Sequence, residues 1–553
     1  MNGNIENARQ IGAELVVSAL EAQGVTHVFG VPGAKIDAVF NALVDSRIET
    51  VVFRHEQNAA FIAGGIGRMT GKAGVAIVTS GPGVSNLVTG LATANSEGDP
   101  VVALGGAVAT GEALKQIHQT MDAVSLLKPV TKFSVTVGAP EQVNEVMANA
   151  FRVAETGRPG AAYVNLPKDV MTHACAYTPL PPPAFAGLGL ADSAAIKEAA
   201  RLINAASTPV VLLGMLASRL TNAAALQEFI GKGNLATVGT FQAAGAVGAM
   251  MFSNFGGRVG QLANQPADRL LDSADLVVTI GYDPVEYWPA LWNEGRRRKI
   301  VHVDVLPADL DNNYCPYVEL TGDIGQTLQA LTSLVDRARK SAISSGILDL
   351  IQSERLLLAR EAAVRNGTPV HPLRLVHELQ QFVGDDITVC LNMDSFHLWI
   401  ARHLYSFKPR QVLITNGQQT LGVALPWAIA ASIVRPHEKV LSISGDGGFL
   451  YSSMELKTAV RLKANIVHMV WVDGSYDMVA TQEKLKYGRS SGTDFGPVGY
   501  VKYADAFGVN KPDEIVSVMK QAFDTPGPVI VGVHVDYRDN HQLFELLHAD
   551  SIH

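Results

Sequence analysis

The sequence has few cysteines and no long apolar run. Its three cysteines, Cys175, Cys315 and Cys390, are far apart and form no Cys-x-x-Cys pair, so they predict reduced thiols rather than a disulfide framework or a zinc site. No apolar stretch approaches the ~20 residues that span a bilayer. The N-terminal segment MNGNIENARQ has no basic start followed by an apolar run, unlike a signal peptide. We therefore expect a soluble, cytoplasmic protein.

Basic residues are fewer than acidic residues. The chain has 44 lysines and arginines against 52 aspartates and glutamates, a net charge of -8, which gives no electrostatic reason to expect nucleic acid or an anionic membrane as a partner. Hydrophobic residues make up 47% of the chain and charged residues 17%, so the protein is folded rather than disordered. Its 553 residues exceed what one hydrophobic core supports and suggest about three domains.

Short β-branched runs alternate with helical segments along the whole chain. Each run is apolar on successive residues, which is typical of parallel strands covered on both faces. The expected strands are residues 25–30, 49–55, 74–80, 100–106, 161–167, 209–214, 235–240, 276–281, 299–305, 387–392, 411–416, 439–444, 465–473 and 528–535. This alternation predicts an α/β protein with three doubly wound parallel-sheet domains.

Two segments interrupt the alternation and are expected to be linkers. Residues 178–184 are rich in proline, which neither continues a helix nor fits a central strand. Residues 341–369 are charged and helical in pattern, without a strand. The predicted domains are therefore residues 1–177, 190–340 and 370–553.

One glycine-rich loop carries the most chemical information. A predicted strand runs into Gly445-Asp446-Gly447-Gly448, and the next strand ends 27 residues later in Asp473. Glycines let backbone N–H groups approach a phosphate, and ligands of open α/β sheets bind beyond the carboxyl ends of strands. A carboxylate among phosphate-binding amides would repel the ligand unless a cation lay between them, so Asp446 indicates a bound divalent metal, most plausibly magnesium.

This loop, with Asp473 and its following turn, resembles the signature of thiamine diphosphate enzymes. The resemblance implies that magnesium is bound by Asp446, Asp473 and the carbonyl of Ser475. It also implies cofactor contacts from the residues around the loop and the next helix: Ser395, Phe396, Gly447, Gly448, Tyr476, Asp477 and Met478.

The N-terminal domain should supply the other half of such a site. The segment Arg54-His55-Glu56, followed by Ala59-Ala60, matches the place of the family's glutamate, so the resemblance implies that Glu56 is the general acid/base relay that activates thiamine. Judged alone, Glu56 would be an ordinary charge at a helix terminus. Thr79 and Asn86, in and after Thr79-Ser-Gly-Pro-Gly83, match the pyrimidine-side loop.

Further segments resemble the platform beneath the thiazolium ring and the substrate site. Leu421 falls where the family places an apolar wedge, and the carbonyl of Gln419 would face the 4′-amino group; plain burial of Leu421 in a core remains open. Gln119, in His118-Gln-Thr-Met-Asp122, matches a glutamine near the reacting centre. Lys35 is a candidate for holding a carboxylate substrate, beside the alternative of a solvated lysine.

Longer stretches are similar to acetolactate synthases of the FAD-independent, catabolic type. They are residues 29–37, 93–100, 282–287 and 476–483. Gln482 stands where FAD-dependent relatives carry a tryptophan that favours 2-ketobutyrate. The implied activity is a carboligase that decarboxylates pyruvate and condenses the two-carbon unit with a second pyruvate to give 2-acetolactate and CO2, with thiamine diphosphate and Mg2+ as cofactors and no FAD.

Two alternatives stay open at this point. One is a flavin-linked relative, either a FAD-containing acetohydroxyacid synthase or a pyruvate oxidase. The other is a non-catalytic paralogue, which only Asp394 favours, because relatives carry glycine there beside the diphosphate. Since the resemblance implies that the Glu56 domain of one chain faces the Asp446 domain of another, we expect a homodimer or homotetramer with sites at the subunit interface.

Overall fold

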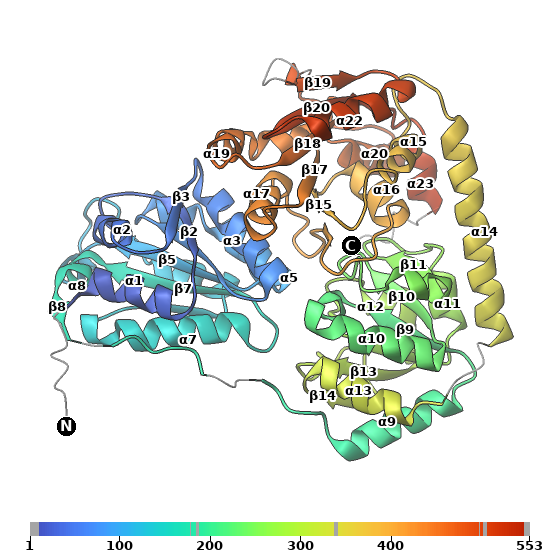
Figure 1. Cartoon of the computed structure of the whole chain (residues 1–553), viewed down its shortest axis with the longest axis horizontal. Coiled ribbons are helices and arrows are strands. Elements are labelled where there is room, and N and C mark those ends of the chain that lie inside the picture. The colour runs from blue at the N-terminus through green and yellow to red at the C-terminus, as the bar shows by residue number, and fades with distance from the viewer. Residues whose placement is uncertain are drawn as a thin grey trace. The chain divides into compact units, whose positions relative to one another are not determined.

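The computed structural model describes residues 10–176, 178–183, 187–336, 341–496, 498–500 and 506–546. By internal contacts the chain divides into two compact units. The first holds the chain up to Ala186 together with Ile429–Arg435 and Ser452–Leu462, and the second holds the remainder. Three parallel sheets of six strands form the framework, each with helices on both faces (Figure 1).

The first unit is built on an N-terminal sheet with the order β3-β2-β4-β5-β7-β6. Its strands are β2 (His27–Val31), β3 (Glu49–Val52), β4 (Gly74–Val78), β5 (Val101–Ala107), β6 (Phe133–Thr136) and β7 (Ala161–Pro167). Helix α3 (Glu56–Thr70) packs on α5 (Val88–Glu97), while α1 (Gly12–Ala22) packs on α2 (Asp37–Val44) and α7 (Val143–Glu155). The strand order reverses between β2 and β4, so the turns that follow them flank the crevice where α/β sheets bind ligands.

A central sheet in the second unit has the order β11-β10-β9-β12-β13-β14. Its strands are β9 (Pro209–Leu213), β10 (Ala236–Thr240), β11 (Phe255–Val259), β12 (Leu276–Ile280), β13 (Lys299–Asp304) and β14 (Val318–Thr321). This is the strand order of dinucleotide-binding folds, with its switch point between β9 and β12.

The C-terminal sheet, also in the second unit, has the order β16-β15-β17-β18-β20-β19. Its strands are β15 (Ile387–Leu391), β16 (Val412–Leu413), β17 (Lys439–Gly445), β18 (Ile466–Val472), β19 (Ala506–Val509) and β20 (Val529–His534). Counted along the chain, this order is the same as that of the N-terminal sheet. Its switch point lies between β15 and β17, at the ends of which Asp394 and Asp446 follow.

The predicted α/β class with three parallel doubly wound sheets is confirmed, and each of the fourteen expected strands overlaps an observed one. Four strands of these sheets were missed, β6, β11, β14 and β19, as was the two-stranded antiparallel sheet of β1 (Gln10–Ile11) and β8 (Ala174–Cys175). Residues 178–183 of the predicted first linker have no helix or strand, and Ala184 lies outside the described residues. The domain boundaries stay a prediction, since Ile429–Arg435 and Ser452–Leu462 group with the N-terminal unit.

The second predicted linker is a single helix, α14 (Ala342–Val364). It packs against α11 (Asp268–Ser273), α15 (Pro372–Leu379) and β11, so it joins the central and C-terminal sheets of the second unit rather than spanning open solvent. Within the described ranges, no helix is both long and apolar enough to cross a membrane.

Candidate active site

Glu56 occupies the first position of α3, four residues after β3 ends. His55 caps the helix, its ring Nδ1 accepting a hydrogen bond from the Gln57 N–H at 3.2 Å. Asn86, at the end of the short helix α4 (Pro82–Ser85), donates from Nδ2 to Oε2 of Glu56 at 2.9 Å. Gly83 leaves space on the other side, because a Cβ there would lie 3.7 Å from Oε1. One carboxylate oxygen is therefore fixed and the other faces a small residue.

A second, fully buried glutamate holds the turn that carries Glu56. Glu455 accepts from the backbone N–H of Arg54 at 3.1 Å and from Nδ2 of Asn58 at 3.0 Å, both on Oε1. Thr458 donates to its Oε2 at 2.7 Å. These bonds fasten the residues on both sides of Glu56 to the segment Ser452–Leu462 of the same unit. Sequence reasoning missed Glu455, because nothing local marks its contact with a turn about 400 positions earlier.

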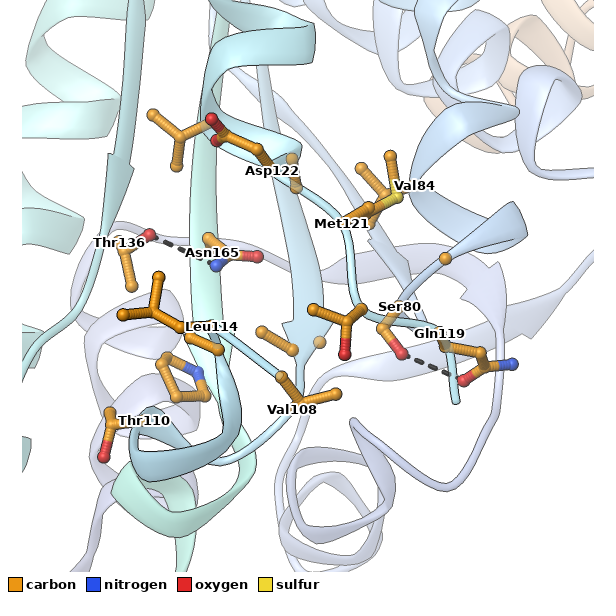
Figure 2. A pocket seen from close by; sticks show the side chains of 18 residues that line it. Ser80, Val84, Val108, Thr110, Leu114, Gln119, Met121, Asp122, Thr136 and Asn165 are labelled. Carbon is orange, nitrogen blue, oxygen red and sulfur yellow. Dashed lines mark hydrogen bonds between the residues drawn. The ribbon is translucent and has the colours of Figure 1, made fainter. Parts of the chain in front are cut away.

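The loop after β4 contacts Gln119. Ser80 donates from its hydroxyl to Oε1 of Gln119 at 2.9 Å, and Gln119 itself has a positive φ of 63° and is exposed (Figure 2). Thr79 is half-buried; its Oγ1 has no hydrogen-bond partner within the described part of the chain, and its side chain lies against Gly33. Lys35 follows in the turn after β2 and is partly exposed.

A cavity of about 490 Å3 opens beside Gln119, between the loop after β5 and the sheet (Figure 2). Most of its walls are apolar, with Val84, Val108 and Met121 among them. Among the described residues, Asp122 is the only charged side chain that lines it. Such a wall favours an uncharged or weakly polar part of a substrate over a phosphate.

The glycine-rich loop brings the two predicted metal-ligating carboxylates together. Asp446 begins the short helix α18 (Asp446–Leu450), and its Oδ2 accepts from the N–H groups of Asp473 at 3.1 Å and Gly474 at 2.7 Å. Its Oδ1 accepts from Gly447 N at 2.9 Å. Asp473 follows β18 and accepts from the Ser475 hydroxyl at 3.0 Å.

Two more carboxylates, Asp394 and Asp477, lie close to this pair. Burial and the negative charges of Asp446, Asp394 and Asp477 together raise the pKa of Asp473 to about 8. Burial likewise raises the pKa of Asp394 to about 7, helped by Asp446 and Asp477. Burial also raises the pKa values of Asp446 and Asp477. A cation between Asp446 and Asp473 would offset these charges, and oxygen donors suit magnesium.

No group of three or more histidine, cysteine, aspartate or glutamate side chains that could hold a metal is found among the described residues. The predicted ligand set does not require one, because its third member is the backbone carbonyl of Ser475.

Glycines at this edge of the C-terminal sheet leave no room for side chains. A Cβ on Gly445 would lie 1.6 Å from Asp394 Oδ2, and one on Gly448 would lie 2.0 Å from Asn392 Nδ2. Asn392 is fully buried and its Oδ1 accepts from Val423 N at 3.1 Å, but its Nδ2 has no partner among the described residues. Gly445 and Gly448 thus let Asp394 and Asn392 lie directly against the backbone, and Asn392 Nδ2 is a buried donor that a diphosphate oxygen can use.

The remaining predicted cofactor residues surround this loop on the same unit. Asp394 caps α16 (Ser395–His403) by accepting from Ser395 N at 2.8 Å, and the Ser395 hydroxyl donates to Asp477 at 2.6 Å. Phe396 is fully buried with its ring 5.5 Å from that of Trp471.

Tyr476 immediately precedes α20 (Asp477–Tyr487), which carries Met478 and Gln482, and all three are partly exposed. In the loop before α17 (Ala424–Val434), Gln419 is exposed with a positive φ of 50°. Leu421 in the same loop is partly exposed, with Cδ2 3.8 Å from the Cβ position of Gly448.

The switch point of the central sheet is filled by the chain itself. Glu286 is buried, and its two carboxylate oxygens accept from the N–H of Met215, directly beyond β9, at 3.0 and 2.9 Å. Asp283 N and the Thr240 hydroxyl also donate to it, at 3.1 and 2.5 Å. Backbone donors at this position are those that a dinucleotide phosphate uses in related folds, so Glu286 takes the place of a phosphate.

Comparison with known proteins covers nearly the whole chain. Residues 11–126 match the N-terminal TPP binding domain of thiamine pyrophosphate enzymes, residues 196–331 the central domain, and residues 395–533 the C-terminal TPP binding domain. A catabolic acetolactate synthase of Raoultella terrigena is 52% identical over 547 residues, 98% of each chain. The chain belongs to the acetolactate synthase family of thiamine pyrophosphate enzymes.

Other members of the acetolactate synthase family are similar over comparable lengths. An acetolactate synthase of Bacillus subtilis is 48% identical over 96% of this chain and 94% of its own. The large subunit of acetolactate synthase isozyme 1 of Escherichia coli K12 is 30% identical over 96% and 94%. Glu56, Thr79, Asn86 and Gln119 fall in the first TPP-binding region, and Asp446, Asp473 and Ser475 fall in the second.

Proposed function

We propose that this protein is an acetolactate synthase: it decarboxylates pyruvate and condenses the two-carbon unit with a second pyruvate, giving 2-acetolactate and CO2. The observation that carries the proposal is the cluster of Asp446 and Asp473 beside the glycine loop, in a chain 52% identical to a catabolic acetolactate synthase. Asp446 and Asp473 lie together and, with the Ser475 carbonyl, fit magnesium, and the unpartnered Nδ2 of Asn392 beside Gly448 fits a diphosphate oxygen.

Each half of the site has its own task in this proposal. Asp446, Asp473 and the carbonyl of Ser475 hold the metal, while the glycine loop and Asn392 Nδ2 hold the diphosphate. When bound, thiamine diphosphate supplies a nucleophilic carbon and an electron sink. Glu56, fixed through Asn86 on one oxygen, uses the other to hold or release a proton at the coenzyme's pyrimidine nitrogen.

The substrate is held by groups of the N-terminal unit of one subunit and of α20 of its partner subunit. Gln119, kept in place by Ser80, positions the reacting carbonyl at the mouth of the apolar cavity. Exclusion of water by that cavity favours loss of CO2, because a charged carboxylate becomes a neutral product in a poorly solvating environment. Lys35 and Gln482 complete the proposed pyruvate contacts, and Leu421 and the Gln419 carbonyl support the coenzyme.

Flavin has no part in the proposed reaction, since Glu286 already uses the donors at the switch point of the central sheet. The coenzyme needs both the Glu56 half and the Asp446 half, so we propose a homodimer or homotetramer with its sites at the subunit interface. We place the enzyme in the cytoplasm, where its three free cysteines stay reduced.

The test is product formation from pyruvate alone, measured as acetoin after acid treatment, with magnesium and thiamine diphosphate supplied. We expect Glu56→Ala to lower kcat at least about 100-fold with an unchanged melting temperature. The matched control is Glu145→Ala, an exposed glutamate in the first turn of α7, which should keep wild-type turnover. No product at saturating cofactor would point instead to the non-catalytic paralogue, and turnover retained in Glu56→Ala would refute the relay.

A further inference from the structure

Two small cavities adjoin each other on either side of Arg355, at the middle of α14. One, of about 50 Å3, lies between α14, β11 and the end of α16. The other, of about 120 Å3, lies between α14 and α15. They share four lining residues, Arg355, Leu358, His403 and Tyr405. All of these residues belong to the second unit, and none is among the residues assigned above to the coenzyme or to pyruvate.

The smaller cavity has an excess of positive charge. Arg258, Arg355 and Arg402 line it, and the one carboxylate on its walls, Glu354, is already bound to Arg269 at 2.6 Å. Asp268 also lies near Arg402 and brings a second negative charge to the cluster. Asp268 also accepts from the Tyr287 hydroxyl and the Gln265 N–H, both at 2.7 Å, so the three guanidinium groups have more positive charge than these two carboxylates offset. Buried charges without partners cost several kcal/mol each.

The guanidinium groups are held in place by neutral partners. Arg258 donates to the carbonyl groups of Ala401 at 3.0 Å and Leu404 at 2.8 Å. The Arg355 group lies over the rings of Phe252 and Tyr405, 4.9 and 5.1 Å from their centroids. Carbonyl groups and aromatic faces orient these cations without neutralising them.

One donor of the cluster is left over. Nη1 of Arg355 is buried and has no hydrogen-bond partner in the part of the chain that the structure describes. A buried guanidinium N–H without an acceptor is unfavourable, and an incoming oxyanion supplies both the missing acceptor and the missing charge.

The larger cavity has the opposite character. Half of its ten lining residues are aliphatic, and His377 and Gln380 are polar members of the wall; the aliphatic residues are Leu358, Ala359, Ala362, Leu373 and Val376. His403, at the junction of the two cavities, is uncharged near neutral pH, because burial and the neighbouring Arg402 and Arg355 lower its pKa to about 3. A ligand that satisfies both cavities therefore has an anionic head and a short apolar chain.

We propose that the two cavities form one binding site for a short aliphatic carboxylate, with its carboxylate among Arg258, Arg355 and Arg402 and its alkyl chain between α14 and α15. The site reaches the C-terminal end of α16, whose N-terminal end carries Asp394, Ser395 and Phe396. Nine residues, about 14 Å of helix, separate the two ends.

Butyrate is the probe, because it has the required head and chain and no keto group to be turned over. Isothermal titration calorimetry on the intact protein with magnesium and thiamine diphosphate should show saturable binding of butyrate, at least tenfold tighter than binding of 1-butanol or of inorganic phosphate. From acetate to butyrate the affinity should rise about fourfold per methylene. Equal binding of the three probes, or no rise with chain length, would overturn the proposal.

Variants of α14 distinguish this site from pyruvate binding elsewhere. Arg355→Met should weaken butyrate binding at least tenfold while kcat and KM for pyruvate stay unchanged. Arg360→Met, an exposed arginine on the same helix, is the matched control and should bind butyrate as the wild type does. If Arg355→Met lowers the melting temperature, Arg355→Lys and Arg402→Gln provide the same comparison. The site would be rejected if butyrate bound all three variants as tightly as it binds the wild type.

Discussion

Replacing Arg68 by methionine tests how far the N-terminal unit depends on one buried ion-pair network. Arg68 lies on α3, twelve positions after Glu56, and is 2% exposed, while Glu97 and Asp99 are fully buried. Its Nε donates to Asp99 Oδ1 at 2.9 Å, and its Nη2 donates to Asp99 Oδ2 at 3.0 Å and to Glu97 at 3.1 Å. The change removes the Arg68 guanidinium from two buried carboxyl groups, so we expect the free energy of unfolding to fall by about 3–5 kcal/mol.

The pH dependence of this loss distinguishes uncompensated charge from lost packing. In the variant the two carboxyl groups can bind protons instead of staying charged. Keeping one of them protonated costs about 1.4 kcal/mol for each pH unit above its ordinary titration range. The native state of the variant then holds more protons than its unfolded state, so the variant should recover stability as the pH falls from 7 to 5. A pure cavity effect would show no such recovery.

The assay is denaturant unfolding at pH 7 and pH 5, combined with hydrogen exchange of α3 peptides because a chain of several domains need not unfold in two states. Arg47→Met is the control, since Arg47 is 93% exposed and 3.9 Å from Glu21, and exposed pairs contribute little. The triple change Arg68→Met, Glu97→Gln, Asp99→Asn should restore more than half of the loss. A single Arg68→Met variant as stable as the control would refute the reasoning.

Three further changes test other parts of the structure. Burial lowers the pKa of His468 to about 3, so the unfolded state binds a proton before the native state does as the pH falls. Between pH 7 and pH 5 the wild type should therefore lose about 2 kcal/mol of stability through this residue, and the His468→Gln variant should not show that loss. Glu455→Ala should lower kcat about 10- to 100-fold with little change in KM for pyruvate, because Arg54 and Asn58 lose their hydrogen-bond acceptor. Glu455→Gln should retain most of the turnover. Equal kinetics in both variants would contradict the positioning role of Glu455. Asp394→Asn keeps the helix cap but removes a charge, so coenzyme titration at fixed magnesium should give about tenfold tighter binding; unchanged or weaker binding would mean that the carboxylate does not face the diphosphate.

How well each strand could be predicted follows from its place in the sheet. Central strands such as β5 and β18 are buried on both faces, so their apolar runs are continuous and easily recognised. The four strands missed in the six-stranded sheets are all edge strands, and their sequences are mixed: Phe-Ser-Val-Thr in β6 and Phe-Gly-Gly-Arg-Val in β11, for example. The edge strands that were predicted, β3 and β16, are shorter than expected. One side of an edge strand faces no neighbour, which relaxes the pattern.

The candidate site divides along a similar line. Gly445 to Gly448 and the turn at Asp473 are contiguous motifs, so their chemistry was readable from the sequence. Glu455 and Asn392 act through contacts with residues that are far away in the chain or lie in another loop, and neither stands in a recognisable motif. The ion-pair network of Arg68, Glu97 and Asp99 could not be predicted from the sequence for the same reason. The coenzyme and substrate residues expected from the sequence stay predictions, and the structure gives each of them a position where mutation can test it.

Glu286 has a consequence for the evolution of cofactor use. A side chain held within reach of Met215 N–H competes as a tethered ligand, at an effective concentration that a free nucleotide in the cell does not reach. Asn416 donates to the backbone carbonyl of Glu286 at 2.8 Å, and Arg410 donates to that of Met215 at 3.0 Å. Residues beside the C-terminal sheet therefore also hold Glu286 and Met215 in place. Evolving a nucleotide site at this position would therefore require more than opening a crevice. The Glu286 side chain would have to leave the Met215 N–H, and the contacts that hold both residues would be lost.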